Sequence, residues 1–359
     1  IVAVSTTREI QKWIGEKTRT IDLKDRTVLP GFNDAHAHII GVGHQSSDLD
    51  LGGVSSIASI QRRLREKAKE TPKGKWIFGR GWDQDRLKEK RYPTRWDLDK
   101  VARDNPVFLI RVCGHVGIAN SKALEQAGFD VRTSASLSEF IDKNPETGEP
   151  TGLVKEKAVD LICNLPEPTE KDLVKACTIA LAKAAKVGLT SVTCISGSLR
   201  EVHALQKLRK QNRLVLRVYV MIPAECLDDF TNKELDDPFL KIRCVKIFSD
   251  GSLGARTAAL AEPYADEPST TGILYHNLSE LIELIRKADK AGFQIAVHAI
   301  GDQASMQVLQ AFETALGKAR VAEHRHRIEH ASVLNPDLIK RIRMLGLLVT
   351  VQPHFVVSD

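Results

Sequence analysis

Several features that define special classes of protein are absent from this 359-residue sequence. No apolar run approaches the roughly 20 residues that a membrane-spanning helix requires, and no internal repeat or low-complexity segment is evident. These absences argue against a membrane span and against a repeat array. The hydrophobic fraction of 42% and the charged fraction of 27% are ordinary for a globular protein, so we expect a soluble protein with no membrane partner.

The cysteines lack the spacing of a disulfide framework. The six of them lie far apart, no C-x-x-C pair occurs, and most lie in apolar segments, as Cys194 and Cys244 do. We therefore expect them to be reduced core residues. A signal-peptide pattern is also missing, which favours a cytoplasmic location. The chain opens at Ile1 without a methionine, so the sequence leaves open whether a leader peptide has been removed.

No stripe of basic residues runs through the sequence. The 52 Lys and Arg and the 46 Asp and Glu are scattered, and the net charge is only +6. In the densest basic stretch, residues 62–75, basic residues alternate with Glu and no aromatic residue is interleaved, which is typical of a solvated helix face. We expect no nucleic-acid partner.

Short apolar runs rich in β-branched residues alternate, after about residue 186, with longer segments of helical periodicity. This alternation predicts βα units, and the continuously apolar runs predict a parallel sheet buried on both faces. With one run near the N-terminus, the predicted strands are Thr27–Ala35, Leu189–Ile195, Leu214–Ile222, Ile242–Phe248, Gln294–Ile300, Arg327–Ala331 and Leu347–Gln352. Seven such strands predict an α/β fold, a TIM-like (β/α)8 barrel whose eighth strand lies beyond Asp359.

Helix signals lie between these runs. Ser279 is predicted to cap one helix, which ends before Gly292. Asn335 and Pro336 are predicted to begin another helix, which ends at Gly346. Each predicted helix leads directly into the next strand, as the barrel requires.

Two segments lie outside the barrel pattern. Residues 1–26 are predicted to form part of a small β-sandwich appendage, which leaves residues 27–359 as the barrel domain. Residues 45–165 form a long insertion after the first barrel strand, with strands predicted at Trp76–Gly81 and Val107–Val112. Because such insertions fall on the active-site side, we expect this one to cover the site and to shape substrate choice.

Four histidines occur at the ends of predicted strands. His36 and His38 are two positions apart, so in a strand both side chains point to one face and can bind one metal ion. His298 and His330 end two further runs. Because the carboxyl ends of all barrel strands open onto one mouth, this placement predicts a metal centre. For the H-x-H pair alone, two surface loop histidines are the alternative.

Lys246 is a charged residue in an otherwise apolar run. A buried lysine is unfavourable unless it is neutralised, paired or used in chemistry. Two interpretations stay open. The amine reacts with carbon dioxide to give a carbamate that bridges two metals, or it lies at the strand edge and reaches solvent.

Five motifs occur in order along the chain. They are P-G-F-x-D-x-H-x-H at 30–38, V-K-I-F-S-D-G-S-L-G-A-R-T-A-A-L at 245–260, V-H-A-I-G-D at 297–302, I-E-H-A at 328–331 and V-Q-P-H at 351–354. Together they resemble the amidohydrolase superfamily and, more narrowly, the branch that includes N-substituted formamide deformylase. The resemblance covers nearly the whole chain.

The resemblance implies one or two divalent metals per chain, held by His36, His38, Lys246, His298 and His330. The first two histidines would bind one ion and the last two a second. The lysine would bridge them as a carbamate or serve as an unmodified ligand in a one-metal site. An aspartate at the end of the eighth strand, metal ligand and general base, is also implied. Asp359 follows the preceding motif too closely to be that residue, so we expect the sequence to end before strand eight.

Six further residues are candidates for contact with substrate: Trp82, Asp83, His115, Asp250, Arg256 and His354. By resemblance the first three face the substrate from the insertion, although a loop histidine is the alternative for His115. Asp250 and Arg256 follow the lysine strand into a glycine-rich loop, where an internal ion pair is the alternative. His354 and Lys246 are the predicted catalytic residues, with the histidine placed to stabilise an oxyanion.

These residues predict a metal-dependent hydrolase that cleaves a non-peptide C–N bond in a small-molecule amide, formamides first. Zinc is the leading metal, although the same ligands suit iron, manganese or nickel. A metal-binding or regulatory protein without turnover is one alternative. A histidine-rich barrel phosphoesterase is the other, although no glycine-rich phosphate loop stands out. A homodimer is compatible with the sequence.

Overall fold

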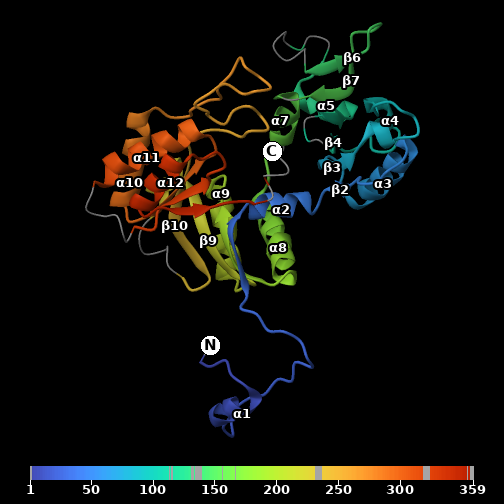
Figure 1. Cartoon of the computed structure of the whole chain (residues 1–359). Coiled ribbons are helices and arrows are strands. Elements are labelled where there is room, and N and C mark those ends of the chain that lie inside the picture. Colours follow the sequence, from blue (N-terminus) through green and yellow to red (C-terminus); the bar gives the residue numbers. More distant parts are fainter. Residues whose placement is uncertain are drawn as a thin grey trace.

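The computed structural model describes residues 2–112, 114, 116–130, 133, 140–155, 157–165, 167–230, 237–317, 324–353 and 355. These residues form two sheets, one of seven strands and one of six (Figure 1). The larger sheet carries the strands that were predicted for the barrel. The smaller one belongs to the insertion.

The seven-stranded sheet is parallel throughout, and its strand order follows the chain. Its strands are β1 (Phe32–Ala37), β8 (Leu189–Ile195), β9 (Arg217–Pro223), β10 (Leu240–Phe248), β11 (Gln294–Ala299), β12 (Arg327–His330) and β13 (Leu348–Thr350). Each lies within or overlaps one predicted run. Strand β1 begins later than predicted, at Phe32, because pairing with β8 starts only there, opposite Leu189.

The sheet curls into a nearly closed barrel. Strands β1 and β13 are its two edges, yet β1 and β12 are joined across the interior. The guanidinium of Arg327 on β12 donates a hydrogen bond to the backbone oxygen of Ala35 on β1, at 2.8 Å. A flat sheet would hold these two strands far apart, since four others lie between them. The barrel architecture predicted from sequence is confirmed.

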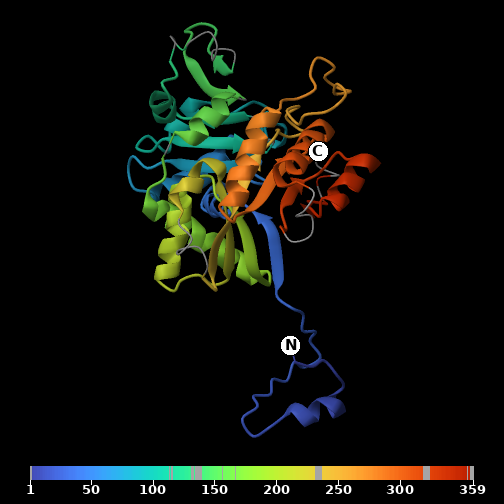
Figure 2. The same cartoon turned by 90° about the vertical axis from the view of Figure 1, so that its left-hand side faces the viewer.

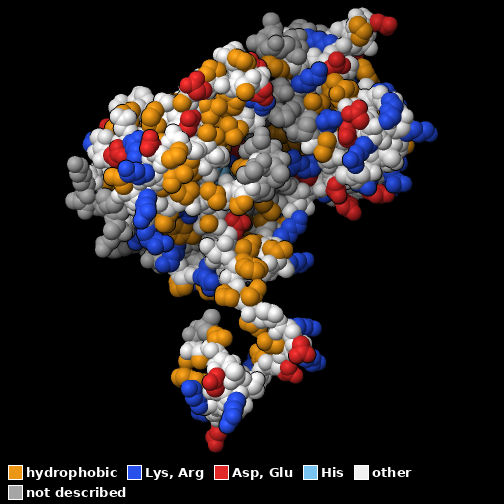
Figure 3. Space-filling view, viewed as in Figure 1, with side chains coloured by type: hydrophobic (Ala, Val, Ile, Leu, Met, Phe, Trp, Pro, Cys, Tyr) orange, Lys and Arg blue, Asp and Glu red, His pale blue; other side chains and the backbone are white. Residues whose placement is uncertain are grey.

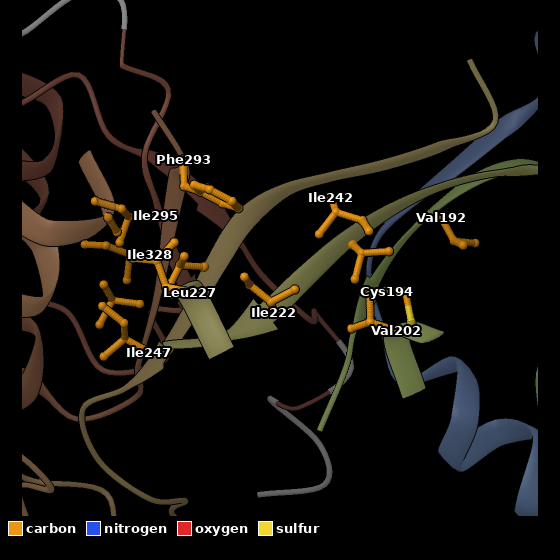
Figure 4. Packing of buried hydrophobic residues seen from close by; sticks show 14 of the residues in the cluster. Val192, Cys194, Val202, Ile222, Leu227, Ile242, Ile247, Phe293, Ile295 and Ile328 are labelled. Atoms are coloured by element: carbon orange, nitrogen blue, oxygen red, sulfur yellow. The ribbon is translucent and has the colours of Figure 1, made fainter. Parts of the chain in front are cut away.

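Helices connect the barrel strands and cover the outside of the sheet (Figure 2). They are α8 (Glu170–Lys186), α9 (Leu199–Lys210), η3 (Ala224–Asp229), α10 (Leu278–Lys290), α11 (Asp302–Leu316) and α12 (Pro336–Met344). The main hydrophobic core lies between this layer and the strands. Figure 4 shows strand residues such as Ile222 and Ile295 in this cluster together with Val202 of α9. No helix in the described part of the chain is long and apolar enough to cross a membrane.

The helix boundaries follow capping side chains. Asn335 caps α12 as predicted, and its side chain accepts from the backbone N–H of Leu338. Helix α10 is capped by Asn277, whose side chain accepts from the backbone N–H of Glu280. The prediction of Ser279 as that cap was wrong, because Asn277 forms a reciprocal capping box with Glu280 and begins the helix two residues earlier.

The insertion folds around the six-stranded mixed sheet, with strand order β2-β3-β4-β5-β7-β6. Its strands are β2 (Leu49–Asp50), β3 (Ile77–Trp82), β4 (Val107–Arg111), β5 (Val116–Ala119), β6 (Ile141–Lys143) and β7 (Pro150–Lys155). Its helices, with the linking α2, are α2 (Ile39–Gln45), α3 (Ile57–Glu70), η2 (Gln84–Arg86), α4 (Arg95–Asp99), α5 (Ser121–Ala127) and α7 (Lys157–Asn164). Helix α2 leads from the carboxyl end of β1 into this part, which therefore begins on the predicted side of the barrel (Figure 1).

Residues 2–31 extend away from the barrel and contain one short helix, α1 (Thr7–Ile10), and one 3-10 turn, η1 (Gln11–Trp13). No strand occurs in residues 2–31, and apolar side chains such as Val4 and Ile21 are exposed there. A β-strand needs partners, and the described residues provide none for this segment. The β appendage stays a prediction.

Figure 3 shows charged side chains of both signs mixed over the visible face of the molecule.

Candidate metal centre

The four histidines singled out in the sequence lie together at the carboxyl ends of β1, β11 and β12. The ring centroid of His330 lies 4.7 Å from that of His36 and 4.6 Å from that of His298. The rings of His36 and His38 are 5.6 Å apart. Residues separated by almost 300 positions are therefore neighbours, because parallel barrel strands end at a common mouth.

Lys246 lies in the same cluster, on β10. Its side chain is buried, at 2% exposure, so the alternative of a lysine that reaches solvent does not hold. Its Nζ has no hydrogen-bond partner within the described residues and lies 4.7 Å from the ring centroid of Phe248. Burial lowers the pKa of this amine to about 8. A buried and unpartnered amine with a lowered pKa is suited to chemical modification or to metal binding.

Three histidines of the cluster are held in the neutral form that binds metals, namely the buried His298, the half-buried His330 and the more exposed His38. Burial, reinforced by Lys246 and neighbouring imidazoles, lowers the pKa of His298 to about 3. The same effects lower the pKa of His330 to about 4. Burial also lowers the pKa of His38. At neutral pH these rings therefore each carry a free lone pair, which is the form that ligates a metal.

A buried carboxylate completes one side of the cluster. Glu329 is fully buried, and its Oε2 lies 2.5 Å from Nδ1 of His36, while its Oε1 accepts from Nε of Arg327 at 2.7 Å. Burial alone would raise the pKa of Glu329, but hydrogen bonds from His36 and Arg327 lower it below its ordinary value. The carboxylate of Glu329 therefore accepts hydrogen bonds from His36 on β1 and from Arg327 on β12.

The backbone of β12 changes conformation at the site. His330 has a φ of +73° and Ala331 a φ of +48°, in the left-handed region that is unfavourable for residues with a Cβ. Successive side chains of a regular strand point to opposite faces. Here Glu329 and His330 both reach His36, and the left-handed residue at the end of the strand makes this possible.

The fit to a divalent metal depends on the lysine. Among the described residues, no group of three or more His, Cys, Asp or Glu side chains alone could hold an ion. The donor set that we consider also includes a lysine, whose Nζ is buried without a hydrogen-bond partner. Neutral imidazoles on three strands around an unsatisfied amine are a donor set for zinc and related metals.

Asp250 follows β10 and is buried beside the cluster. Its carboxylate accepts hydrogen bonds from the backbone N–H groups of Ala259, Ile300 and Gly301, at 2.8 to 3.0 Å. It also lies 3.4 Å from Nε2 of His298. These contacts give Asp250 a part in organising the loops after β10 and β11, and they leave its predicted contact with substrate as a prediction.

The remaining predicted residues lie in different surroundings. Arg256 forms an exposed ion pair with Asp266, and its predicted contact with substrate stays a prediction. Trp82 is fully buried in the insertion core, where its indole N–H donates to the backbone oxygen of Leu109 at 2.8 Å. Asp83 pairs with Arg111 at 2.9 Å. His115 and His354 lie outside the described residues.

Three residues of this region were missed in the sequence: Arg327, Glu329 and Gln352. Glu329 and Gln352 belong to motifs that were noticed for neighbouring histidines, and Arg327 begins a predicted strand that ends beside one. Gln352 Oε1 lies 2.7 Å from Nδ1 of His330. The signal that could have found Glu329 is a polar residue within an apolar run. The same signal drew attention to Lys246.

The fold and site define a class: a parallel barrel with histidines and a buried lysine at the carboxyl ends of its strands. Residues 19–359 match the model of the amidohydrolase family. The chain belongs to this family.

Individual relatives agree with the assignment. YtcJ of Bacillus subtilis (strain 168) is 37% identical over 357 residues, which are 97% of this chain and 66% of that protein. N-substituted formamide deformylase of Arthrobacter pascens is 25% identical over 370 residues, with 98% of this chain and 68% of that protein covered. The crystal structure of an uncharacterized metal-dependent hydrolase from Pyrococcus furiosus superposes with a TM-score of 0.78 at 38% identity, over 92% of this chain and 66% of that one. The chain thus spans just under two thirds of the length of YtcJ and of the Pyrococcus protein.

Proposed function

We propose that this protein is a metal-dependent hydrolase that cleaves a non-peptide C–N bond in a small-molecule amide, with formamides as the first substrates to test. The observation that carries the proposal is the convergence of four histidines around the buried and unpartnered amine of Lys246. The name of the deformylase relative, at 25% identity, supports the choice of formamides.

The chain's own side chains would hold the metal and exclude water. The proposed ligands are His36, His38, Lys246, His298 and His330, with zinc as the leading metal and one or two ions per chain. When bound, such a metal supplies Lewis acidity, which acidifies water and polarises a carbonyl group. The ring of Phe248, 5.4 Å from that of His298, forms one wall of this region. His354 is proposed to contact the substrate.

The state of Lys246 is part of the proposal. Its burial favours the neutral amine, because transfer of a charged ammonium from water is unfavourable. The neutral amine would either bind the metal directly or react with carbon dioxide, with release of one proton, to give a carbamate that could serve as a ligand. A crystal structure of the metal-loaded protein distinguishes the two forms.

Elemental analysis of the purified full-length protein tests the centre. We expect one to two zinc or iron ions per chain in the wild type, and less than half of that in His36→Ala and in His298→Ala. His203→Ala is the matched control, because His203 is exposed on α9 and should leave the metal content unchanged. A folded wild type that binds no metal even after incubation with zinc would contradict the proposal.

Turnover separates the hydrolase from its alternatives. The metal-loaded protein is incubated with N-substituted formamides and the released formate is measured. Formate release that His36→Ala abolishes supports the proposed reaction. Stoichiometric metal without release of formate, or of amine from a wider set of amides, favours a metal-binding or regulatory protein instead.

A further inference from the structure

Three of the four clustered imidazoles have one ring nitrogen already engaged by a hydrogen-bond partner. The contacts join Nδ1 of His36 to Glu329 Oε2 at 2.5 Å, Nε2 of His298 to the backbone oxygen of Gly251 at 2.8 Å, and Nδ1 of His330 to Gln352 Oε1 at 2.7 Å. Each contact joins two different strands or the segments that follow them. Glu329 lies on β12, Gly251 follows β10 and Gln352 follows β13.

The chemistry of the partners decides which nitrogen carries the proton. A backbone carbonyl and a carboxylate paired with a guanidinium only accept hydrogen bonds, so the imidazole nitrogen facing them must donate. A neutral imidazole has a single N–H, and its other nitrogen then carries the lone pair. The free lone pairs are those of Nε2 in His36 and Nδ1 in His298.

Glu329 is one of the two side-chain partners, and its own position is fixed. Its side chain is fully buried on β12. Its second oxygen accepts from Nε of Arg327, and the same guanidinium donates to the backbone oxygen of Ala35, the residue before His36. The carboxylate therefore cannot turn without breaking an ion pair and a contact between β12 and β1.

We infer that Glu329 is a positioning residue that fixes the orientation and tautomer of His36, so that Nε2 of His36 faces the metal centre. This inference rests on the proposed function, because a metal centre is what the fixed nitrogen would serve. Carboxylates hydrogen-bonded to metal-binding histidines typically strengthen metal affinity by about 10- to 100-fold. The hydrogen bonds of Glu329 go to His36 and Arg327, and its charge also acts on the neighbouring Lys246.

The test compares zinc affinity in three proteins. Competition with a chromophoric chelator gives the dissociation constant of the full-length wild type, Glu329→Gln and Glu313→Gln. Glu313 on α11 binds Arg341 of α12 through both oxygens, at 3.0 and 2.9 Å, so its variant removes the carboxylate of a more exposed Arg–Glu pair away from the centre. We expect the dissociation constant to rise about 10- to 100-fold in Glu329→Gln and to stay unchanged in Glu313→Gln.

Two further measurements separate positioning from general structural damage. The visible absorption spectrum of the cobalt-substituted protein should change in Glu329→Gln, since the geometry at His36 changes, and should be preserved in Glu313→Gln. Glu329→Asp serves if the Gln variant does not fold. It keeps the charge but withdraws the carboxylate by one methylene, so we expect weaker zinc binding from a folded protein.

The outcomes are distinct. Wild-type zinc affinity and an unchanged cobalt spectrum in folded Glu329→Gln or Glu329→Asp would overturn the positioning role while leaving the metal centre intact. No zinc binding by the wild type would overturn the proposed function itself, and the positioning role with it. Weaker binding confined to the Glu329 variants supports the inference.

Discussion

Asp250 illustrates how one buried carboxylate organises the mouth of the barrel. Its two oxygens accept three backbone N–H groups, from the loop after β10 and from the end of β11. We expect Asp250→Asn to lower the free energy of unfolding by about 2–3 kcal/mol, because the amide must turn an NH2 group toward a backbone donor. Urea denaturation measures the change.

The control for this variant is Asp302→Asn. Asp302, the first residue of α11, accepts from the backbone N–H groups of Ala261 and Gln303, at 2.9 and 3.0 Å, and is only partly buried. Asp302→Asn should lower the free energy of unfolding by less than about 1 kcal/mol, because water can bind the backbone N–H groups that lose their acceptor. Equal losses of unfolding free energy in the two variants would mean that the burial of Asp250 does not increase its contribution to stability.

Single residues were the least predictable part of the molecule. The histidines could be found because they end apolar runs and share one type of chemistry. Trp82 could not be placed, because a tryptophan at the end of a strand has the same sequence pattern in a core as in a binding wall, and the structure buries it. Glu329 was missed because regular strand alternation places it on the face opposite His330. The left-handed φ of His330 changes that geometry.

At the scale of elements, Asn120 ties the insertion together. Its buried side chain accepts from the backbone N–H groups of Val107 and Ala123 and donates to the backbone oxygens of Ala102 and Asn105, at 2.9 to 3.0 Å. We expect Asn120→Ala to destabilise the insertion by about 3 kcal/mol, because four buried backbone groups lose their partner. Amide hydrogen exchange at Val107 should accelerate.

The comparison for that prediction is Asn277→Ala, which removes the cap of α10 in the barrel. We expect Asn277→Ala to lower the free energy of unfolding by only about 1 kcal/mol, because water reaches the N–H groups that are freed at this helix end. Faster exchange should then be confined to α10. Acceleration of exchange at Val107 in both variants would show that insertion and barrel unfold as one unit.

The barrel strands themselves were predictable from sequence for a physical reason. A parallel strand covered on both faces must be apolar along its whole length, so runs such as Leu189–Ile195 and Gln294–Ala299 stand out. Segment ends were less predictable. Residues 27–31 resemble the start of a strand, but strand formation depends on a partner, and pairing begins at Phe32.

At the scale of the whole molecule, the proposed metal would link strands that the chain connects only distantly. The candidate ligands belong to β1, β10, β11 and β12 or follow them directly. We expect zinc at about 100 times its dissociation constant to raise the free energy of unfolding by about 2.7 kcal/mol and the melting temperature by roughly 3 °C. Scanning calorimetry of the metal-free protein with and without zinc measures this.

His36→Ala provides the comparison for the calorimetry. The zinc-dependent shift should shrink or vanish in this variant, because one of the two ligands proposed from β1 and its C-terminal end is removed. Calcium, which prefers oxygen ligands, should leave the wild-type melting temperature unchanged. An equal zinc shift in wild type and variant would place the binding elsewhere on the protein.

The left-handed backbone at His330 and Ala331 implies a conflict between durability and activity. Glycine adopts this conformation without steric cost, so glycine at position 330 would relax the end of β12. It would also remove an imidazole from the centre of the mouth. Laboratory evolution for heat resistance alone would therefore favour loss of the very side chain on which the proposed chemistry depends, and a selection that preserves function must score turnover and endurance together.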